Sequence, residues 1–249
     1  MNPSFYFKQI FRKFLSNPIK YPFLVFRKVF IEPKKYKIND DYKAKEYWEN
    51  RLGKYGENIK GPGDEGATEK MNRIRYKRIF SIIEEIYFEN LSSLKEKNIL
   101  EIGTGTGLIT QIIKDLGFKN YLGVDITDIV FPSLKKRFPN YNFQKTDITT
   151  EKIVGEFDLV FIIDVIEHIV NDDKFVFALQ NIQDCLKNNG LLVIAPVVEK
   201  KFKSQFYEKH WALNDIKDAM PQMIEINDKE WEQNFSKVFV IRKSENFEK

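Results

Sequence analysis

Three glycines at alternate positions, Gly103, Gly105 and Gly107, close the run NILEIGTGTG over residues 98–107. Glycine adopts backbone conformations that other residues avoid, and it has no Cβ. A bend of this kind lets a ligand lie against bare backbone at the N-terminus of a helix. The sequence therefore predicts a binding loop here.

A second run, DVIEH over residues 164–168, combines two carboxylates, Asp164 and Glu167, with His168. Histidine is the side chain that most often takes up a proton near neutral pH. The only other histidine of the chain is His210. The two histidines are the candidates for a catalytic base, should the reaction remove a proton from an alcohol.

The spacing of the glycines limits the ligand. A dinucleotide-binding loop reads G-x-G-x-x-G, whereas here Leu108 stands where that pattern has its third glycine. A phosphate-binding P-loop ends in Gly-Lys-Ser/Thr, and this run does not. Glu101, on the strand before the bend, would repel a pyrophosphate. The pattern E-x-G-x-G-x-G suits a nucleoside ligand with no phosphate and with a positive centre.

An alternation of strands and helices must position these residues. The apolar run 99–102 predicts a strand, and the three- and four-residue spacing of apolar residues over 108–116 predicts a helix. Further strands are predicted over residues 121–125, 142–148, 157–163 and 191–196. This alternation requires a parallel sheet, and ligands of such sheets bind at the carboxyl ends of the strands.

The two ends of the chain have other patterns. A helix is predicted over residues 71–90, before the first strand of the sheet. Near the C-terminus a helix over 213–220 precedes strands over 223–226 and 238–241, with no helix between those two strands. These last strands should form an antiparallel hairpin.

With these features the chain resembles the class I S-adenosylmethionine-dependent methyltransferases, whose first motif has the form E-x-G-x-G-x-G. The DVIEH run is similar to one in quinone O-methyltransferases and in glycan-pathway relatives. The resemblance implies an α/β fold with a Rossmann-like seven-stranded sheet. That sheet is mostly parallel with an antiparallel C-terminal hairpin strand, and helices cover both of its faces.

The resemblance also implies a cofactor site for S-adenosylmethionine, whose product is S-adenosylhomocysteine. Asp125 would hold the ribose hydroxyls, Asp147 would accept from the adenine amino group, and Ile148 would pack on the ring. Asp164 would face the methionyl ammonium or the sulfonium. The full set of expected cofactor contacts is Glu101, Gly103, Thr104, Gly105, Gly107, Asp125, Ile126, Asp147, Ile148 and Asp164. The apolar neighbours of this set, Val165 and Ile166 among them, are expected in the core.

The acceptor chemistry depends on the two histidines. We expect His168 to act as the base or to orient the acceptor, and His210 either to contact substrate or to have no chemical role. In some relatives a Glu-x-x-Glu-His run with a later histidine binds a divalent metal. Here Asp164 occupies the first position of that run, so a metal is not favoured.

Charge divides the chain unevenly. Residues 1–37 carry nine basic side chains and one acidic side chain, whereas the rest of the chain carries 31 basic and 35 acidic ones. We expect three parts: a basic aromatic helical extension over 1–37, a cover segment and helix over 38–90, and the methyltransferase domain over 91–249. The single cysteine, Cys185, indicates a reducing compartment and a small buried side chain.

Within the extension, aromatic residues recur at helical spacing and cations lie beside them, and Pro33 is expected to end the second helix. This pattern suits an anionic membrane surface bound through residues 1–33, or packing on the domain or on a second copy in a homodimer. Nucleic acid is disfavoured as a partner because the cations are few. No apolar run reaches the roughly 18 residues that span a bilayer, and we expect a cytoplasmic protein, with peripheral membrane association left open.

The sequence thus predicts methyl transfer to a hydroxyl oxygen of a small molecule or glycan. Three alternatives remain at this point: a membrane-associated quinone-type O-methyltransferase, a metal-assisted RNA 2′-O-methyltransferase, and a non-catalytic S-adenosylmethionine-binding subunit. The acceptor itself is not encoded in a readable motif.

Overall fold

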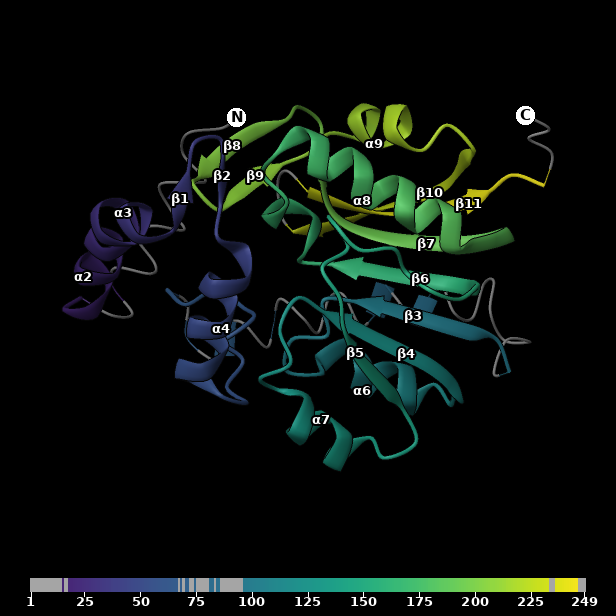
Figure 1. Cartoon of the computed structure of the whole chain (residues 1–249), viewed down its shortest axis with the longest axis horizontal. Helices are drawn as coiled ribbons and strands as arrows, with labels where there is room; N and C mark the ends of the chain where they lie inside the picture. The colour runs from purple at the N-terminus through teal and green to yellow at the C-terminus, as the bar shows by residue number, and fades with distance from the viewer. Residues whose placement is uncertain are drawn as a thin grey trace.

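A seven-stranded sheet forms the centre of the computed structural model, which describes residues 18–66, 96–232 and 236–245, together with residues 15, 68, 70, 71, 74, 81, 82, 84 and 85. Its strands are β3 (Asn98–Ile102), β4 (Asn120–Asp125), β5 (Asn142–Lys145), β6 (Phe157–Ile163), β7 (Leu186–Val198), β10 (Met223–Glu232) and β11 (Ser236–Lys243). Their order across the sheet is β10–β11–β7–β6–β3–β4–β5 (Figure 1). The pairs from β7 to β5 are parallel, and β11 is antiparallel to both β7 and β10. The predicted fold class is confirmed.

Helices cover both faces of this sheet. They are α6 (Leu108–Asp115) and α7 (Phe131–Arg137) on one face, and α8 (Asp172–Cys185) and α9 (Leu213–Ala219) on the other (Figure 1). Successive side chains of a strand point to opposite faces. Accordingly, Ile99 of β3 belongs to the core beneath α6 and α7, and Leu100 to the core beneath α8 and α9. Cys185 is buried in the second core, as predicted.

The N-terminal part described by the structure is a continuous helix with a π-helical segment in its middle. It comprises α2 (Lys20–Phe26), the turn η1 (Arg27–Ile31) and α3 (Glu32–Tyr36). The prediction that Pro33 ends this helix is wrong, since Pro33 lies in the first turn of α3. In an ordinary α-helix proline lacks the N–H for a backbone hydrogen bond, and its ring clashes with the carbonyl one turn earlier. The π-helical turn before Pro33 is wider than an α-helical turn, so the helix can continue through this proline.

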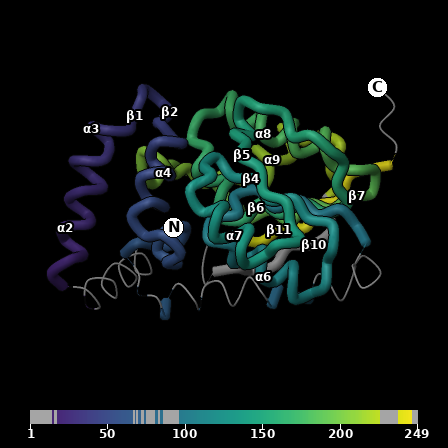
Figure 2. Tube along the Cα trace, turned by 60° about the horizontal axis from the view of Figure 1, so that its bottom comes forward, coloured from purple at the N-terminus to yellow at the C-terminus, as the bar shows by residue number. Residues whose placement is uncertain are grey.

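After α3 the chain forms a short hairpin, β1 (Lys37–Ile38) and β2 (Asp41–Tyr42), and then α4 (Ala44–Tyr55). Helix α4 lies between α2 and the sheet in both views (Figures 1 and 2). A second hairpin, β8 (Phe202–Gln205) and β9 (Glu208–His210), follows β7. It packs its aromatic residues against the N-terminal part in a cluster of Tyr36, Tyr42, Tyr47, Val170, Phe206 and Tyr207.

A buried carboxylate fixes the N-terminal helix to the segment after α4. Glu65 is 5% exposed and accepts hydrogen bonds from Arg27 and Tyr55, and from Lys54 Nζ at 3.1 Å. Burial opposes ionisation, but the hydrogen bonds from Arg27 and Tyr55 lower the pKa of Glu65 to about 2. Lys28 Nζ adds a bond to the Tyr207 hydroxyl at 2.8 Å. These contacts hold the helix, α4 and the second hairpin together.

Two predicted elements fall mainly outside the described residues: the aromatic stripe before residue 15 and the helix over 71–90. In the part of the chain that the structure describes, no helix is long and apolar enough to cross a bilayer.

Candidate active site

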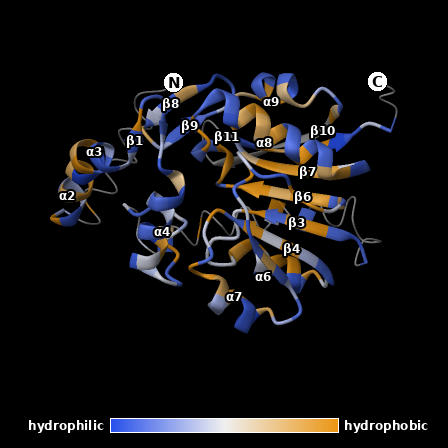
Figure 3. Ribbon diagram, in the orientation of Figure 1, coloured by the Kyte–Doolittle hydropathy of each residue, from blue (hydrophilic) through white to orange (hydrophobic). Residues whose placement is uncertain are grey.

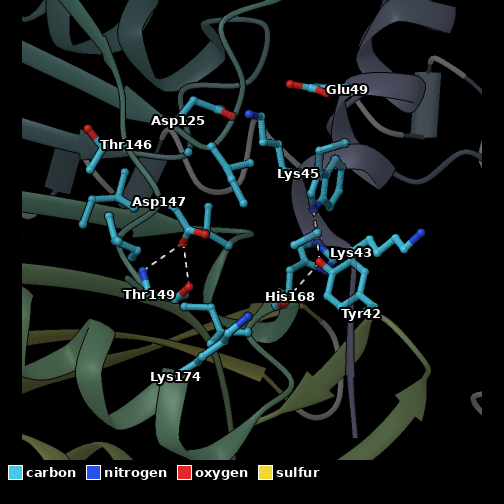
Figure 4. A pocket seen from close by; sticks show the side chains of 18 of the residues that line it. Tyr42, Lys43, Lys45, Glu49, Asp125, Thr146, Asp147, Thr149, His168 and Lys174 are labelled. Carbon is cyan, nitrogen blue, oxygen red and sulfur yellow. Dashed lines mark hydrogen bonds between the residues drawn. The ribbon is translucent and has the colours of Figure 1, made fainter. Parts of the chain in front are cut away.

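One cavity of about 680 Å³ opens at the carboxyl ends of β3, β4 and β6, and α4 closes it from the opposite side. Figure 4 shows Asp125 and Asp147 on the sheet side of this pocket, with Tyr42, Lys45 and His168 across from them. The strand order reverses at β3, between β4 and β6. This is the switch point at which open α/β sheets bind ligands.

The glycine bend forms part of the pocket wall. Gly103 has φ 77° and Gly105 has φ 45°, so both use the left-handed region that L-residues avoid. Both line the pocket. A Cβ on Gly103 would lie 2.1 Å from Cγ2 of Val165, and one on Gly105 would lie 3.0 Å from Cβ of Pro62. The bend is therefore enclosed by the loop after β6 and by the loop after α4.

Asp125 ends β4 beside the bend and is 8% exposed. Its two oxygens accept from the backbone N–H of Gly105 at 3.0 Å and of Thr127 at 3.1 Å. Burial raises the pKa of Asp125 to about 6, although these backbone hydrogen bonds oppose the shift. The carboxylate is thus oriented by the backbone and ionised at neutral pH.

Asp147 and Ile148 lie just beyond β5, which ends at Lys145, earlier than the predicted strand. Asp147 Oδ1 accepts from Thr149 N at 3.0 Å and from Thr149 Oγ1 at 2.6 Å. This turn ends the strand. Asp147, Ile148 and Thr149 all line the pocket.

Asp164 follows β6 and also lines the pocket. Its φ of 58° is unusual for a residue with a Cβ, and its N–H donates to the Ala195 carbonyl at 2.9 Å. Strained backbone of this kind is concentrated at functional sites. The structure thus brings Asp125, Asp147 and Asp164 together with Gly103, Gly105 and Ile126 around one cavity.

His168 lies on the opposite part of the wall, in the short 3-10 helix η2 (Ile166–His168). Its Nδ1 lies 3.1 Å from the Tyr207 carbonyl oxygen. A carbonyl only accepts, so Nδ1 of the neutral ring donates, and Nε2 keeps a lone pair. Burial lowers the pKa of His168 to about 4, and the charge of Glu208 and the bond to Tyr207 offset this only in part. The ring is therefore neutral at physiological pH.

Comparison with known proteins agrees with this geometry. Residues 100–192 match a family described as a methyltransferase domain. The matched stretch runs from β3 to β7 and contains the bend, the three aspartates and His168. This stretch of the chain is thus a methyltransferase domain, and its fold is that of S-adenosylmethionine-dependent methyltransferases.

The names of the relatives refer to different acceptors. A ubiquinone biosynthesis O-methyltransferase of Rickettsia akari is 29% identical over 143 residues, which are 56% of this chain and 54% of that protein. A ribosomal protein L11 methyltransferase of Dictyoglomus turgidum is 26% identical over 142 residues, covering 55% and 43% of the two chains. The matched region is about half the length of these curated relatives.

Solved structures share the fold at lower identity. An S-adenosylmethionine-dependent methyltransferase from Clostridium acetobutylicum has a TM-score of 0.55 at 17% identity, covering 68% of this chain and 92% of that one. An N-methyltransferase from Bradyrhizobium japonicum, solved with S-adenosylhomocysteine, has a TM-score of 0.53 at 17% identity, covering 65% and 85%. The chain thus shares the fold of these solved structures.

Not every residue predicted for the methyltransferase site lies in the pocket. Thr104 and Gly107 lie outside the pocket lining. The Thr104 side chain packs on Gly123, and a Cβ on Gly107 would lie 2.6 Å from Cδ2 of Leu134. Glycine is thus required at position 107 because of α7, and no ligand contact is needed to explain it.

His210 is also outside the pocket lining, and it lies on strand β9, where a loop was expected. Its Nε2 lies 2.9 Å from Glu208 Oε1, and its ring stacks on Phe202 at 4.5 Å. Burial opposes ionisation, but the bond to His210 lowers the pKa of Glu208 to about 2. His210 is therefore paired outside the pocket lining, and its substrate contact stays a prediction. Among the described residues, no three His, Cys, Asp or Glu side chains form a metal-binding group.

Glu101 is also buried away from the pocket. It is 2% exposed and lies outside the pocket lining, with Oε2 accepting from Tyr121 at 2.5 Å and from Thr110 at 2.8 Å. Burial raises the pKa of Glu101 to about 8, against the effect of those hydrogen bonds. The side chain is a protonated core group at neutral pH.

This raised pKa predicts a pH effect on stability. Below pH 4.5 the folded and unfolded forms of Glu101 are both protonated. As pH rises towards 8 only the folded form keeps its proton, so this group removes about 1.4 kcal/mol of stability per pH unit. In urea titrations between pH 5 and 8, we expect the free energy of unfolding of Glu101→Gln, relative to that of the wild type, to rise by about 1.4 kcal/mol per pH unit. The exposed Glu96→Gln is the control, and parallel curves for Glu101→Gln and wild type would contradict the assignment.

Several pocket residues were not predicted as site residues. Trp48 and Tyr42 form an aromatic wall near His168: Trp48 Nε1 donates to the Tyr42 hydroxyl at 3.2 Å, and that hydroxyl donates to the His168 carbonyl at 3.1 Å. The Arg51 guanidinium covers the Trp48 ring at 5.0 Å and donates to the carbonyls of Lys60 and Gly63. Val165, expected in the core, lines the pocket. The adjacent aromatic residues Tyr47 and Trp48 can be noticed in the sequence. Nothing in the local sequence, however, indicates that Trp48 contacts His168.

Proposed function

We propose that this protein transfers the methyl group of S-adenosylmethionine to a hydroxyl oxygen of a small molecule or glycan. The observation that carries the proposal is the neutral His168, with a free lone pair on Nε2, in the same pocket as the glycine bend and three aspartates. The naming of a relative as an O-methyltransferase agrees with oxygen as the acceptor atom.

The sheet side of the pocket fits the methyl donor chemically. Asp125, Asp147 and Asp164 bring carboxylates to it, which suit ribose hydroxyls, an adenine amino group and a cationic sulfonium and ammonium. We assign Asp125 to the ribose, Asp147 and Ile148 to the adenine, and Asp164 to the cationic tail. Gly103, Gly105 and Ile126 complete the contact. When bound, the donor supplies an electrophilic methyl carbon that is attacked in line with its sulfur.

His168 then takes the hydroxyl proton. As the new oxygen–carbon bond forms, the hydroxyl oxygen gains positive charge and becomes strongly acidic, so even a base of pKa about 4 can accept the proton. The bond from Nδ1 to the Tyr207 carbonyl holds the ring and leaves only Nε2 for this task. Trp48 and Tyr42 position the acceptor beside it.

The role of Asp125 has its own test. We expect Asp125→Asn to weaken S-adenosylmethionine binding about 10- to 100-fold, because a hydrogen bond to a charged group contributes roughly 1.5–3 kcal/mol. Wild-type affinity should fall below pH 6, where Asp125 gains a proton, and the variant should lose this pH dependence. Isothermal titration calorimetry measures both. Asp128→Asn, at an exposed carboxylate paired with Lys145, is the control. Wild-type affinity in Asp125→Asn would refute the ribose assignment.

A labelled-methyl transfer assay against fractionated metabolites and glycans tests the function as a whole. We expect the labelled product to be a methyl ether, in which the methyl carbon is bonded to the former hydroxyl oxygen. Label in an amine or a protein would overturn the oxygen assignment. Binding of S-adenosylmethionine without transfer to any fraction would favour the non-catalytic subunit.

A quinone-type acceptor is the second candidate. The aromatic wall of Trp48 and Tyr42 supports it, since a flat ring packs well on such side chains. Transfer to a catechol but not to a glycan would favour this form. The metal-assisted RNA form has less support, because Asp164 and Glu167 do not join the histidines in a ligand cluster within the described chain.

A further inference from the structure

The N-terminal helix from Lys20 to Tyr36 has two different long faces. The face towards the body includes Tyr21, Leu24, Lys28 and Glu32, all half-buried, and ends in the buried Tyr36. The opposite face carries Ile19, Phe23, Phe26 and Phe30 at helical spacing. Figure 3 shows hydrophobic colouring on α2, outside the body of the protein.

This outer stripe remains exposed. Ile19 is 88% exposed, Phe23 60%, Phe26 53% and Phe30 56%. This outer stripe therefore does not pack on the described part of the domain, and packing on the domain was one of the three explanations open from the sequence. Helix α4 separates it from the pocket (Figures 1 and 2), so it is not needed to build the active site.

The charge around the stripe is strongly positive. Residues 18–37 carry six basic side chains and one acid, Glu32, and that acid is held by Arg27 Nε at 2.8 Å. Lys20, Lys34 and Lys37 are exposed, and none of them lies within 4 Å of a carboxylate of the described chain. Excess cations therefore flank an exposed aromatic surface.

This positive charge distinguishes between the two partners that remain for the stripe, a second copy of the chain and a lipid surface. In a symmetric dimer the same patch meets itself, so the lysines of one copy would face those of the other and repel. An anionic bilayer offers the complementary charge and an apolar layer for the phenylalanines. We infer that the outer face of the α2–η1–α3 helix binds an anionic lipid surface, with Phe23, Phe26 and Phe30 inserted at the level of the headgroups.

The contacts of the inner face make this docking compatible with the folded enzyme. Arg27 and Lys28 are bound to Glu65 and Tyr207, so the helix can lie on a bilayer without leaving the body. The inference does not depend on the identity of the acceptor or on methyl transfer.

Flotation of the full-length protein with vesicles tests the inference. We expect flotation with phosphatidylcholine vesicles that contain phosphatidylglycerol, and little with phosphatidylcholine alone. Added salt should weaken the binding. Substituting Lys20, Lys34 and Lys37 by Gln should lower the partition coefficient about fivefold per lysine. Phe23→Ser, Phe26→Ser and Phe30→Ser together should abolish flotation.

The matched control replaces three exposed apolar residues elsewhere, as Ile129→Ser, Val154→Ser and Ile224→Ser, and should float like the wild type. Calorimetric binding of S-adenosylmethionine should be unchanged in the phenylalanine variant, which shows that it is folded and separates this test from the proposed function. Absence of flotation, or equal flotation of the phenylalanine variant and wild type, would overturn the inference. A dimer in light scattering that the phenylalanine substitutions dissociate, without flotation, would assign the surface to a second copy instead.

Discussion

His168→Asn is expected to lower kcat for methyl transfer by a factor of about 10² to 10⁴, the usual contribution of a general base. An asparagine amide can still donate to the Tyr207 carbonyl, which now accepts from Nδ1 at 3.1 Å. The variant should therefore keep the local structure while losing the lone pair of Nε2. Single-turnover kinetics with labelled S-adenosylmethionine measure the effect.

The affinity for the methyl donor should stay within about twofold in this variant, since the donor contacts lie on the sheet side of the pocket. His210→Asn is the control, because His210 lies outside the pocket lining and should keep the wild-type rate. The low pKa of His168 adds a second signature. The acid limb of the wild-type kcat profile due to this group should lie near pH 4, well below the usual range of histidine, and should vanish in the variant. Full activity of His168→Asn would refute the base assignment.

Gly103→Ala is expected to lower the free energy of unfolding by about 2–5 kcal/mol, the sum of a left-handed φ and of overpacking. The φ of 77° is strained for any residue with a Cβ, and the new Cβ would lie 2.1 Å from Cγ2 of Val165. The bend must move to relieve this contact. We therefore also expect S-adenosylmethionine affinity to fall at least about tenfold, a change of 1.4 kcal/mol.

Urea titration and calorimetry measure the two effects. Gly53→Ala is the control: it lies inside α4, its Cβ would be 3.9 Å from Ile129, and alanine should stabilise the helix by up to about 1 kcal/mol. The double variant Gly103→Ala/Val165→Ala removes the clash but keeps the φ strain, so it should recover only part of the stability. Wild-type stability and affinity in Gly103→Ala would show that the bend is not constrained as described.

The parts of the fold that follow from local patterns were predicted well. Strand β6 has the bounds expected from its apolar run, because strands buried on both faces read as continuous hydrophobic stretches. Asp125, Asp147 and Asp164 lie on the same side of the sheet, at the carboxyl ends of β4, β5 and β6, because parallel strands all end on one side. The sheet and its ligand edge thus followed from the sequence.

What the sequence did not reveal depended on contacts between distant segments. Glu101 stands in the motif, yet its strand position turns it towards Tyr121 and Thr110, and strand periodicity alone did not reveal partners on a neighbouring strand and helix. His210 is drawn to Glu208 and Phe202 by a hairpin that no turn signal predicted. Trp48 reaches His168 only because α4 folds across the sheet edge.

The aromatic cluster that joins Tyr36, Tyr42 and Tyr47 to Phe206 and Tyr207 has a consequence for biosynthesis. The N-terminal tyrosines leave the ribosome long before their partners, because some 160 residues separate the two groups in the chain. Closing so long a loop is slow compared with forming the local helices. The contacts that hold Tyr42 and Tyr47 against the domain thus form late. A nascent chain halted before β8 would have the glycine bend and the three aspartates, but not the Phe206 and Tyr207 side chains that hold the N-terminal tyrosines.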